Sequence, residues 1–322
     1  MPDLTCVELC AGAGGQALGL EQAGFRHLLA VDIDEHCYRT LCVNRPDWSP
    51  RQADVRSLVG AGTVPKGVDL LAAGLPCPPF SVAGKQLGHE DERDLFPPAL
   101  SIIEEALPRA VLIENVRGLL DKSFAGYREH ITASLAALGY RSSWRLLNAC
   151  DYGVPQLRPR VNLVALRAES WPDFAWPEPG SVPAPTVGET LRDLMEAEGW
   201  EGAEAWAGQA NKIAPTIVGG STKHGGPDLG PTRARRAWAA LGVDGRLIAE
   251  RAPEPGYSEM PRLTVRMVAR LQGFPDSWTF TGKKTASYRQ VGNAFPPPVA
   301  RAVGMQIKRA LLAGERGVAV AV

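Results

Sequence analysis

The stretch VELCAGAGGQALGLEQAGF, residues 7–25, is followed closely by VDID, residues 31–34. An apolar segment leads through a glycine-rich turn into a helical segment, and an acid ends the next apolar segment, which is the order of a nucleoside-cofactor site. A ligand can approach the backbone at three glycines, Gly12, Gly14 and Gly15. Asp32 can accept hydrogen bonds from ribose hydroxyls. The alternative is a tight turn whose glycines serve packing alone.

The alternation of short apolar runs with amphipathic stretches continues through residue 166. It predicts an α/β fold in which a mostly parallel sheet is covered by helices on both faces. The expected strands are residues 5–9, 28–32, 69–73, 110–114 and 162–166. Apolar spacings of three and four predict helices over residues 16–23, 35–43, 95–107 and 127–138.

A proline-rich segment, WPDFAWPEPGSVPAP at residues 171–185, predicts a linker that leaves the sheet. The region after it is rich in Gly, Pro and Thr, with a helical piece at 191–206 and another at 263–274. A last helix of about 15 residues is expected after Phe295. We therefore expect a large domain of residues 1–170 and 286–322 and a smaller, loop-rich domain of residues 171–285.

The composition limits the function only loosely. Lys and Arg number 35, as do Asp and Glu, so bulk charge does not indicate a nucleic-acid partner, and any DNA contact must come from local patches. The six cysteines do not show the paired spacings of a metal site or a disulfide framework. Because we find no leader and no apolar run long enough to span a membrane, we expect a cytoplasmic location.

The segment GLPCPPFS, residues 74–81, places Cys77 among three prolines directly after the apolar run VDLLAA. Proline fixes φ and cannot extend a β-ladder, so the prolines should end the strand and hold the cysteine in a stiff turn. A stiff turn suits a reactive thiol. A small side chain packed in a loop is an equally good interpretation of Cys77 by itself.

Two further motifs follow expected strands. Glu114 in ENVRGL emerges from a buried strand at the sheet edge where ligands bind, and burial should raise its pKa towards that of a proton donor. A turn cap is the alternative for this residue. Arg158 and Arg160 in QLRPR alternate before an apolar strand, so period two predicts that they point to one side, where they suit a phosphate or a base carbonyl. A solvated strand face is the alternative.

Together these residues describe one chemistry. The C5 carbon of cytosine is a poor nucleophile, but a thiolate that adds at C6 while an acid protonates N3 turns the ring into an enamine that can attack a sulfonium methyl group. The chain resembles the DNA cytosine-5 methyltransferases of bacterial modification systems. The matching segments run in the family's order: ELCAGAGG, DID, GLPCPPFSVAGKQLG, ENV, QLRPR, RLTVRMVARLQGFPD and QVGNAFPPPVA.

The resemblance implies a Rossmann-like methyltransferase fold with a small target-recognition domain, residues 171–285. It implies that Cys77 is the nucleophile, that Glu114 contacts N3, and that Arg158 and Arg160 hold the target nucleotide. It also implies that S-adenosylmethionine binds without a metal and becomes S-adenosylhomocysteine. The cofactor residues would be Leu9, Cys10, Ala11, Gly12, Gly14, Gly15, Asp32, Ile33, Asp54, Val55, Leu75, Pro76, Asn293 and Ala294.

Double-stranded DNA is the implied partner of a monomeric enzyme, and a cognate restriction endonuclease is left open. The loop Ser81–Asp94 would close over DNA about Gly84 and Gly88. In residues 211–238, glycines and prolines break regular structure and basic side chains gather that can contact guanine or phosphates. The expected DNA-binding residues of these two regions are Ser81, Lys85, Gln86, Lys223, Arg233, Arg235 and Arg236.

Two positions depart from the family, which usually has an aromatic residue at Cys10 and Gln at Pro78. Three alternative functions share parts of this pattern: an RNA cytosine-5 methyltransferase, a catalytically silent DNA-binding relative, and a nicotinamide-dependent oxidoreductase. The long variable region disfavours the first, because a duplex reader needs extra loops. Intact Cys77 and Glu114 disfavour the second. The AGAGG spacing disfavours the third, because a cofactor with a ribose and an amino-acid tail fits it better than NAD.

Overall fold

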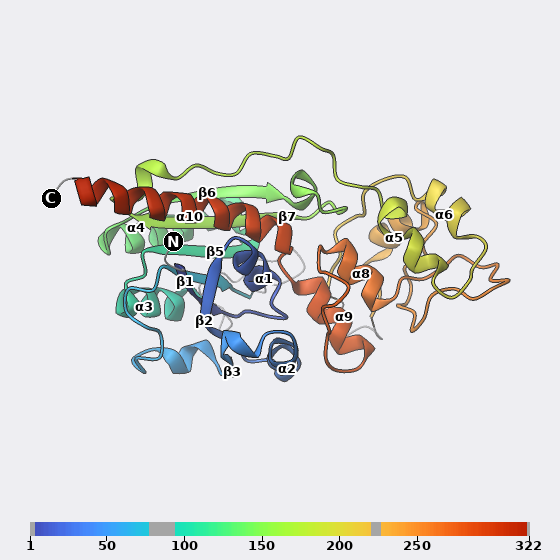
Figure 1. Cartoon of the computed structure of the whole chain (residues 1–322), viewed down its shortest axis with the longest axis horizontal. Helices are drawn as coiled ribbons and strands as arrows, with labels where there is room; N and C mark the ends of the chain where they lie inside the picture. The colour runs from blue at the N-terminus through green and yellow to red at the C-terminus, as the bar shows by residue number, and fades with distance from the viewer. Residues whose placement is uncertain (1–3, 77–93, 220–226, 321–322) are drawn as a thin grey trace. The chain divides into compact units, whose positions relative to one another are not determined.

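The computed structural model describes residues 4–76, 94–219 and 227–320, and the side chains of all of these except residues 315–320. The chain divides into two compact units (Figure 1). The first consists of residues 1–147, 159–178 and 299–322, and the second of residues 148–158 and 179–298. The predicted domain boundaries, at residues 170 and 285, lie near the edges of these units but do not coincide with them.

The first unit contains a seven-stranded sheet in the order β3-β2-β1-β4-β5-β7-β6. The strands are β1 Leu4–Leu9, β2 Phe25–Asp32, β3 Pro50–Gln52, β4 Leu70–Gly74, β5 Ala110–Val116, β6 Tyr140–Asn148 and β7 Pro159–Arg167. Strands β3, β2, β1, β4 and β5 pair in parallel, and β7 joins β5 in antiparallel orientation. The carboxyl ends of the parallel strands therefore meet at one edge, where ligands bind in sheets of this kind.

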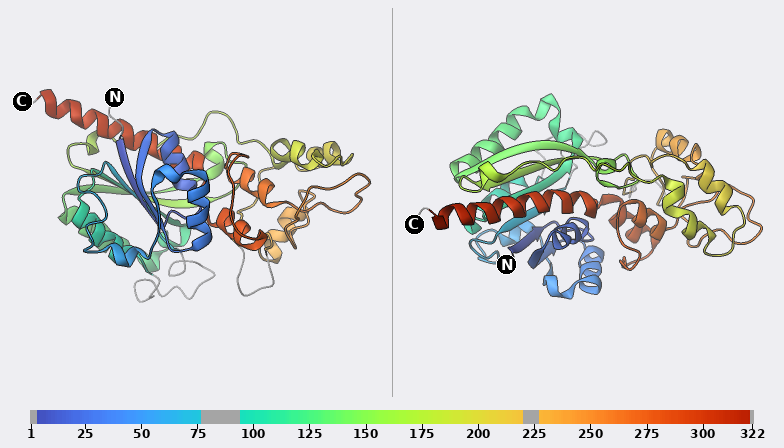
Figure 2. Two further views of the ribbon diagram at one scale, coloured as in Figure 1. Left: turned by 60° about the horizontal axis from the view of Figure 1, so that its bottom comes forward. Right: turned by 45° about the horizontal axis from the view of Figure 1, so that its top comes forward.

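Helices cover both faces of this sheet, as predicted, and Figure 2 shows them on either side of it. They are α1 Gly15–Gln22, α2 Glu35–Asn44, α3 Phe96–Ala106, α4 Ala125–Ala137 and α10 Pro297–Val320. Alternate strand residues such as Val7, Leu71 and Val111 pack with Ile102 of α3 and Ile131 of α4 in one apolar cluster. Because successive side chains of a strand point to opposite faces, alternate residues of β1, β4 and β5 enter this cluster. The α/β fold is confirmed.

Three local predictions need correction. Strands β3 and β6 were not predicted, because β3 has only three residues, none of them buried, and the sequence of β6, YRSSWRLLN, is largely polar and half-exposed, without the apolar run of a buried strand. The helical piece expected over 191–206 is two helices, since Gly199 between them adopts a φ of 89° that a helix does not allow. The last helix has 24 residues where about 15 were expected, because it continues through the two glycines, Gly314 and Gly317, that follow the expected segment.

The second unit has five helices among its described residues: α5 Val187–Glu196, α6 Ala203–Gln209, α7 Thr232–Ala239, α8 Val265–Leu271 and α9 Lys284–Asn293. Its described β-structure is limited to two isolated bridges, Gln156 with Ala214 and Ala249 with Thr264. Buried Trp206 and Trp238 contribute to a small apolar interior. Residues 148–158 belong here because Leu157 and Gln156 hydrogen-bond to the segment 214–217. The role of this unit in target recognition stays a prediction.

Candidate active site

The glycine-rich turn lies between β1 and α1, at the carboxyl edge of the sheet. Gly12 adopts a positive φ of 55°, and a Cβ built on it would meet no atom within 4 Å. Cys10, which precedes it, also has a positive φ, 52°, which is uncommon for a non-glycine residue and marks a constrained turn. The open space beside Gly12 is what a ligand needs to approach the backbone closely.

Asp32, at the end of β2, holds this turn in place. One carboxylate oxygen accepts a hydrogen bond from the Gly12 N–H at 2.7 Å, and the other accepts one from the Asp34 N–H at 2.8 Å. Burial raises the pKa of Asp32, and these backbone hydrogen bonds oppose that shift. Each carboxylate oxygen has a second lone pair, so the group can still accept ribose hydroxyls. The sequence indicated the ribose contact but not the structural role.

Three further predicted cofactor residues, Asp54, Ile33 and Cys10, lie close to the ends of β3, β2 and β1. Asp32 pairs with Gln52 in the sheet, so Asp54 follows close to the tip of β2, where it accepts the Arg56 N–H at 2.9 Å. Ile33 is 64% exposed and offers an apolar face. Burial holds the pKa of the Cys10 thiol well above its usual range, so this cysteine is a neutral, polarisable surface.

Three of the remaining cofactor candidates of the first unit, Leu9, Val55 and Leu75, are buried. All three belong to the apolar cluster that packs on the sheet. Whether each predicted residue contacts the cofactor stays a prediction.

The predicted proton donor, Glu114, lies on β5, two residues before its end, between β4 and β7. It pairs with Gly74 of β4 and with Asn162 of β7, and it is buried to 7% exposure. Arg160 forms an ion pair with it, with 2.9 Å between Arg160 Nε and Glu114 Oε1. The sequence analysis did not pair these two residues, because only the antiparallel register of β5 and β7 brings them together.

Asn115, the next residue, donates its side-chain amide to the Leu75 carbonyl at 3.4 Å. This hydrogen bond connects β5 to the leucine of the segment GLPC, residues 74–77. The sequence alone assigns Asn115 no role. Its position directly after the candidate acid Glu114 was the one sequence feature that could have marked it as a site residue.

Cys77 follows β4 by three residues in the sequence and lies outside the described residues, as do the predicted DNA contacts Ser81, Lys85, Gln86 and Lys223 and the predicted hinges Gly84 and Gly88. Asp94, at which the predicted loop ends, is buried. It accepts hydrogen bonds from the Phe96 N–H at 3.0 Å and from the Tyr127 hydroxyl. The start of α3 is therefore fixed on α4.

Arg158 has other partners than Arg160, and the expectation that both residues hold the target nucleotide stays a prediction. Strand β7 begins at Pro159, and period two does not extend to Arg158. Its guanidinium donates to the backbone carbonyls of Ile217, Gly292 and Ala294 at 2.6, 2.9 and 2.9 Å, all within the second unit. The side chain is 1% exposed, which suits a residue that holds loops together.

The other site residues predicted in the second unit lie on α7 and at the end of α9. The expectation that residues 211–238 lack regular structure is therefore wrong from Thr232 onward, where the sequence has no further glycine or proline and forms α7. Arg233 and Arg236 of α7 are exposed and Arg235 is half-buried, so these cations can meet a ligand in solution. Asn293 ends α9 and Ala294 follows it. The carbonyl of Ala294 is one of those that Arg158 binds.

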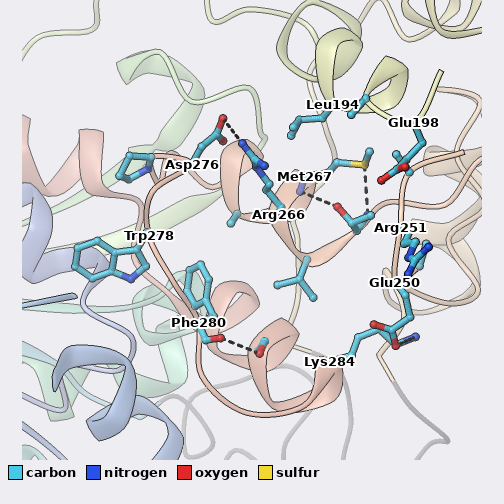
Figure 3. Close-up of a pocket in the computed structure, with 18 residues that line it drawn as sticks. Leu194, Glu198, Glu250, Arg251, Arg266, Met267, Asp276, Trp278, Phe280 and Lys284 are labelled. Atoms are coloured by element: carbon cyan, nitrogen blue, oxygen red, sulfur yellow. Dashed lines mark hydrogen bonds and ion pairs between the residues drawn. The ribbon is translucent and has the colours of Figure 1, made fainter. Parts of the chain in front are cut away.

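Figure 3 shows a hollow of about 510 Å³ that is lined entirely by the second unit. Trp278 lines it, and its charged groups include two ion pairs, Arg266 with Asp276 at 3.2 Å and Lys284 with Glu250 at 2.9 Å. Its basic groups are thus largely matched by acidic ones, whereas a DNA backbone needs excess positive charge. None of the residues predicted for catalysis, cofactor or DNA lines this hollow.

Neither a metal site nor a membrane-spanning helix occurs in the described part of the chain. No group of three or more His, Cys, Asp or Glu side chains is placed to hold a metal ion there. Across those same residues, no helix combines the length and the hydropathy that crossing a membrane requires.

Comparisons with known proteins agree with this geometry. The family model for C-5 cytosine-specific DNA methylase matches residues 4–309. The chain is 58% identical to the type II methyltransferase M.NaeI of Lentzea aerocolonigenes, over 97% of this chain and 76% of that protein. It is 54% identical to M.NgoMIV of Neisseria gonorrhoeae, over 95% and 98%. The solved structure of the S. pombe Dnmt2 methyltransferase shares the fold, with a TM-score of 0.62 at 20% identity, over 95% of this chain and 98% of that one.

Proposed function

The chain belongs to the C-5 cytosine-specific DNA methylase family, and from that premise we propose how its residues transfer a methyl group to C5 of cytosine in DNA. It is a DNA cytosine-5 methyltransferase of the restriction-modification type, as its likeness to type II methyltransferases over nearly its whole length supports. The single observation that carries the proposed site is the buried ion pair of Arg160 and Glu114 beside Gly74, three residues before Cys77.

The methyl donor in this proposal is S-adenosylmethionine, and the first unit offers groups that fit its parts. The open space at Gly12 admits a ligand to the backbone, the Asp32 carboxylate is placed for ribose hydroxyls, and exposed Ile33 offers a surface for the adenine. When bound, this cofactor supplies a methyl group activated by a sulfonium. Asn293 and Ala294 remain proposed contacts of the second unit.

Glu114 is the proposed proton donor to N3 of the target cytosine. Arg160 holds Oε1 of this carboxyl group and so fixes its plane, while Oε2 lies towards Gly74 at the end of β4. A fixed carboxyl group keeps the reacting atoms aligned, which is the main contribution of an orienting residue. Arg160 is thus a positioning residue, and it can also contact the nucleotide that the acid protonates.

Cys77 is the proposed nucleophile. Its thiolate adds to C6 while Glu114 protonates N3, which makes C5 electron-rich. C5 then takes the methyl group, and loss of the C5 proton together with the thiolate restores the aromatic ring. The prolines around Cys77 limit the conformations of the turn and so aim the thiol.

In this proposal the second unit selects the DNA sequence. The exposed arginines of α7 contact the duplex, and buried Arg158 holds together the loops of that unit. We further propose that the enzyme works as a monomer on double-stranded DNA and protects it from a cognate endonuclease.

Covalent capture tests this site. A duplex with 5-fluorocytosine at the methylated position has no C5 proton to lose, so it should trap the wild-type enzyme in the presence of S-adenosylmethionine as a band that survives denaturation. Cys77→Ser should give no such band yet still bind DNA, because a hydroxyl is a far weaker nucleophile at neutral pH. Capture of the serine variant at the wild-type rate would assign the nucleophile to another residue.

A further inference from the structure

Gln16, the second residue of α1, carries a buried side chain that the proposed mechanism does not use. It is 3% exposed, and neither its amide nitrogen nor its amide oxygen has a hydrogen-bond partner in the part of the chain that the structure describes. Buried amides are almost always hydrogen-bonded, because an unmade bond leaves the cost of desolvation uncompensated. A polar group of this kind is accounted for when a ligand supplies its partner.

The amide points to the carboxyl end of β4, next to the catalytic groups. A Cβ built on Gly74 would lie 3.8 Å from Gln16 Oε1, 3.2 Å from the Cys10 carbonyl oxygen and 4.0 Å from Glu114 Oε2. Three oxygens from three different segments therefore surround one point at Gly74, which helps explain why this position has no side chain. Gln16 lies between the glycine-rich turn and the proton donor.

The strand order indicates which part of the cofactor reaches this point. The strands β2, β1 and β4 are neighbours in that order, and the ribose contact, Asp32, is at the tip of β2. A ligand that extends from there across the turn after β1 arrives at the tip of β4, where its amino-acid tail meets Gln16. That tail carries an ammonium and a carboxylate, and a primary amide has one acceptor and two donor hydrogens to match them.

We propose that Gln16 is a cofactor-binding residue that recognises the amino-acid end of S-adenosylmethionine. Its oxygen accepts a hydrogen bond from the ammonium, and its nitrogen donates one to the carboxylate. Hydrogen bonds to charged groups are stronger than neutral ones, and the N-terminus of α1 adds a favourable field for the carboxylate. This inference rests on the proposed cofactor and adds a residue to its site.

Binding of two ligands by the apolar variant Gln16→Met tests the proposal. S-adenosylhomocysteine carries the amino-acid end and 5′-methylthioadenosine lacks it, so calorimetry with both separates this contact from the rest of the site. We expect Gln16→Met to bind S-adenosylhomocysteine about ten- to a hundredfold more weakly than the wild type, while its affinity for methylthioadenosine is unchanged. Gln16→Leu should behave in the same way.

The chain provides a matched control in Gln306 on α10, whose side-chain oxygen is also buried without a hydrogen-bond partner among the described residues. Gln306→Met should bind both ligands as the wild type does. The melting temperature of unliganded Gln16→Met should equal or exceed that of the wild type, since a thioether removes an unpaired buried amide.

Wild-type affinity of Gln16→Met for S-adenosylhomocysteine would overturn the proposal, and so would an equal loss for both ligands. A wild-type protein that binds neither ligand would instead overturn the cofactor assignment under the proposed function, and this inference with it.

Discussion

The two units of this chain use different means to hold their functional residues. In the first unit, apolar strands alternate with helices. The positions of Asp32, Gly74 and Glu114 are set by the strands at or near whose ends they lie. The described part of the second unit has short helices and two isolated bridges, and buried polar side chains such as Arg158 connect its loops. A regular sheet can place reacting groups accurately, whereas loops on a polar framework can change sequence without loss of the fold.

The segment QLRPR crosses from the second unit to the first, and its two arginines show the different roles that polar side chains have in the two units. Arg158 belongs to the second unit, where it binds three backbone carbonyls. Arg160, two residues later, belongs to the first unit, where it holds the carboxyl group of Glu114. Substitutions in the first unit should therefore mainly affect the rate of methyl transfer, whereas substitutions in the second unit should mainly affect stability and the choice of DNA target.

The largest effect should come from the acid of the first unit. Glu114→Gln cannot supply the proton, and we expect the rate of methyl transfer to fall on the order of 10² to 10⁴, while S-adenosylhomocysteine binds normally. Single-turnover kinetics with calorimetry measures both quantities. A single-turnover rate of Glu114→Gln equal to that of the wild type would show that Glu114 is not the proton donor. It would also contradict the assignment of the chemistry to the first unit.

Next in size is the loss of the polar framework of the second unit. Arg158→Met leaves three carbonyls without their donor and should lower the free energy of unfolding by about 3 to 5 kcal/mol. Denaturant unfolding, followed with a probe in the second unit, measures it. The matched variant Arg160→Met leaves the buried carboxyl group of Glu114 without its cation, so it should lower the stability of the first unit and also slow methyl transfer. Destabilisation of the second unit by Arg160→Met to the same extent as by Arg158→Met would contradict the separate roles of these arginines.

A smaller effect is expected on DNA recognition. Replacing Arg233, Arg235 and Arg236 together by Ala should weaken DNA binding or relax the target site, because an arginine that pairs with a base contributes about 1 to 3 kcal/mol of discrimination. Removal of an arginine that pairs with a phosphate should also flatten the dependence of affinity on salt. Filter binding at several salt concentrations and methylation mapping provide the data. If the triple variant kept the DNA affinity, the salt dependence and the site preference of the wild type, recognition would lie elsewhere in the second unit.

The smallest expected effect concerns pH. Hydrogen bonds from Arg246 and Arg262 hold the pKa of Asp244 well below its usual range. A lowered native pKa stabilises the fold above the unfolded-state pKa of about 4, and that contribution is lost as the pH falls through the native value. Because Arg246 is largely exposed, we expect about 1 kcal/mol. Asp244→Asn should be less stable than the wild type at pH 7, and the difference should shrink steadily as the pH falls below about 4. A difference that stays constant over that range would contradict this.

The sequence predicted most of the first unit and little of the second. The turn at Gly12 and the strand-end acids were found because glycines and apolar periodicity are local signals. The partners of Arg158 were not found, since they lie 59, 134 and 136 residues away in segments without periodicity. Gln16 was passed over for a similar reason, because its surroundings depend on which strand is next to β1.

The central claim is that this chain methylates C5 of cytosine in duplex DNA, with chemistry in the first unit and target choice in the second. Transfer of a labelled methyl group from S-adenosylmethionine to duplex DNA and to transfer RNA, followed by mapping of the modified base, tests it most directly. The account predicts 5-methylcytosine in the DNA, at one cytosine of a single short sequence, and none in the RNA. Labelled RNA with unlabelled DNA, or methyl groups spread over cytosines in every sequence context, would contradict it.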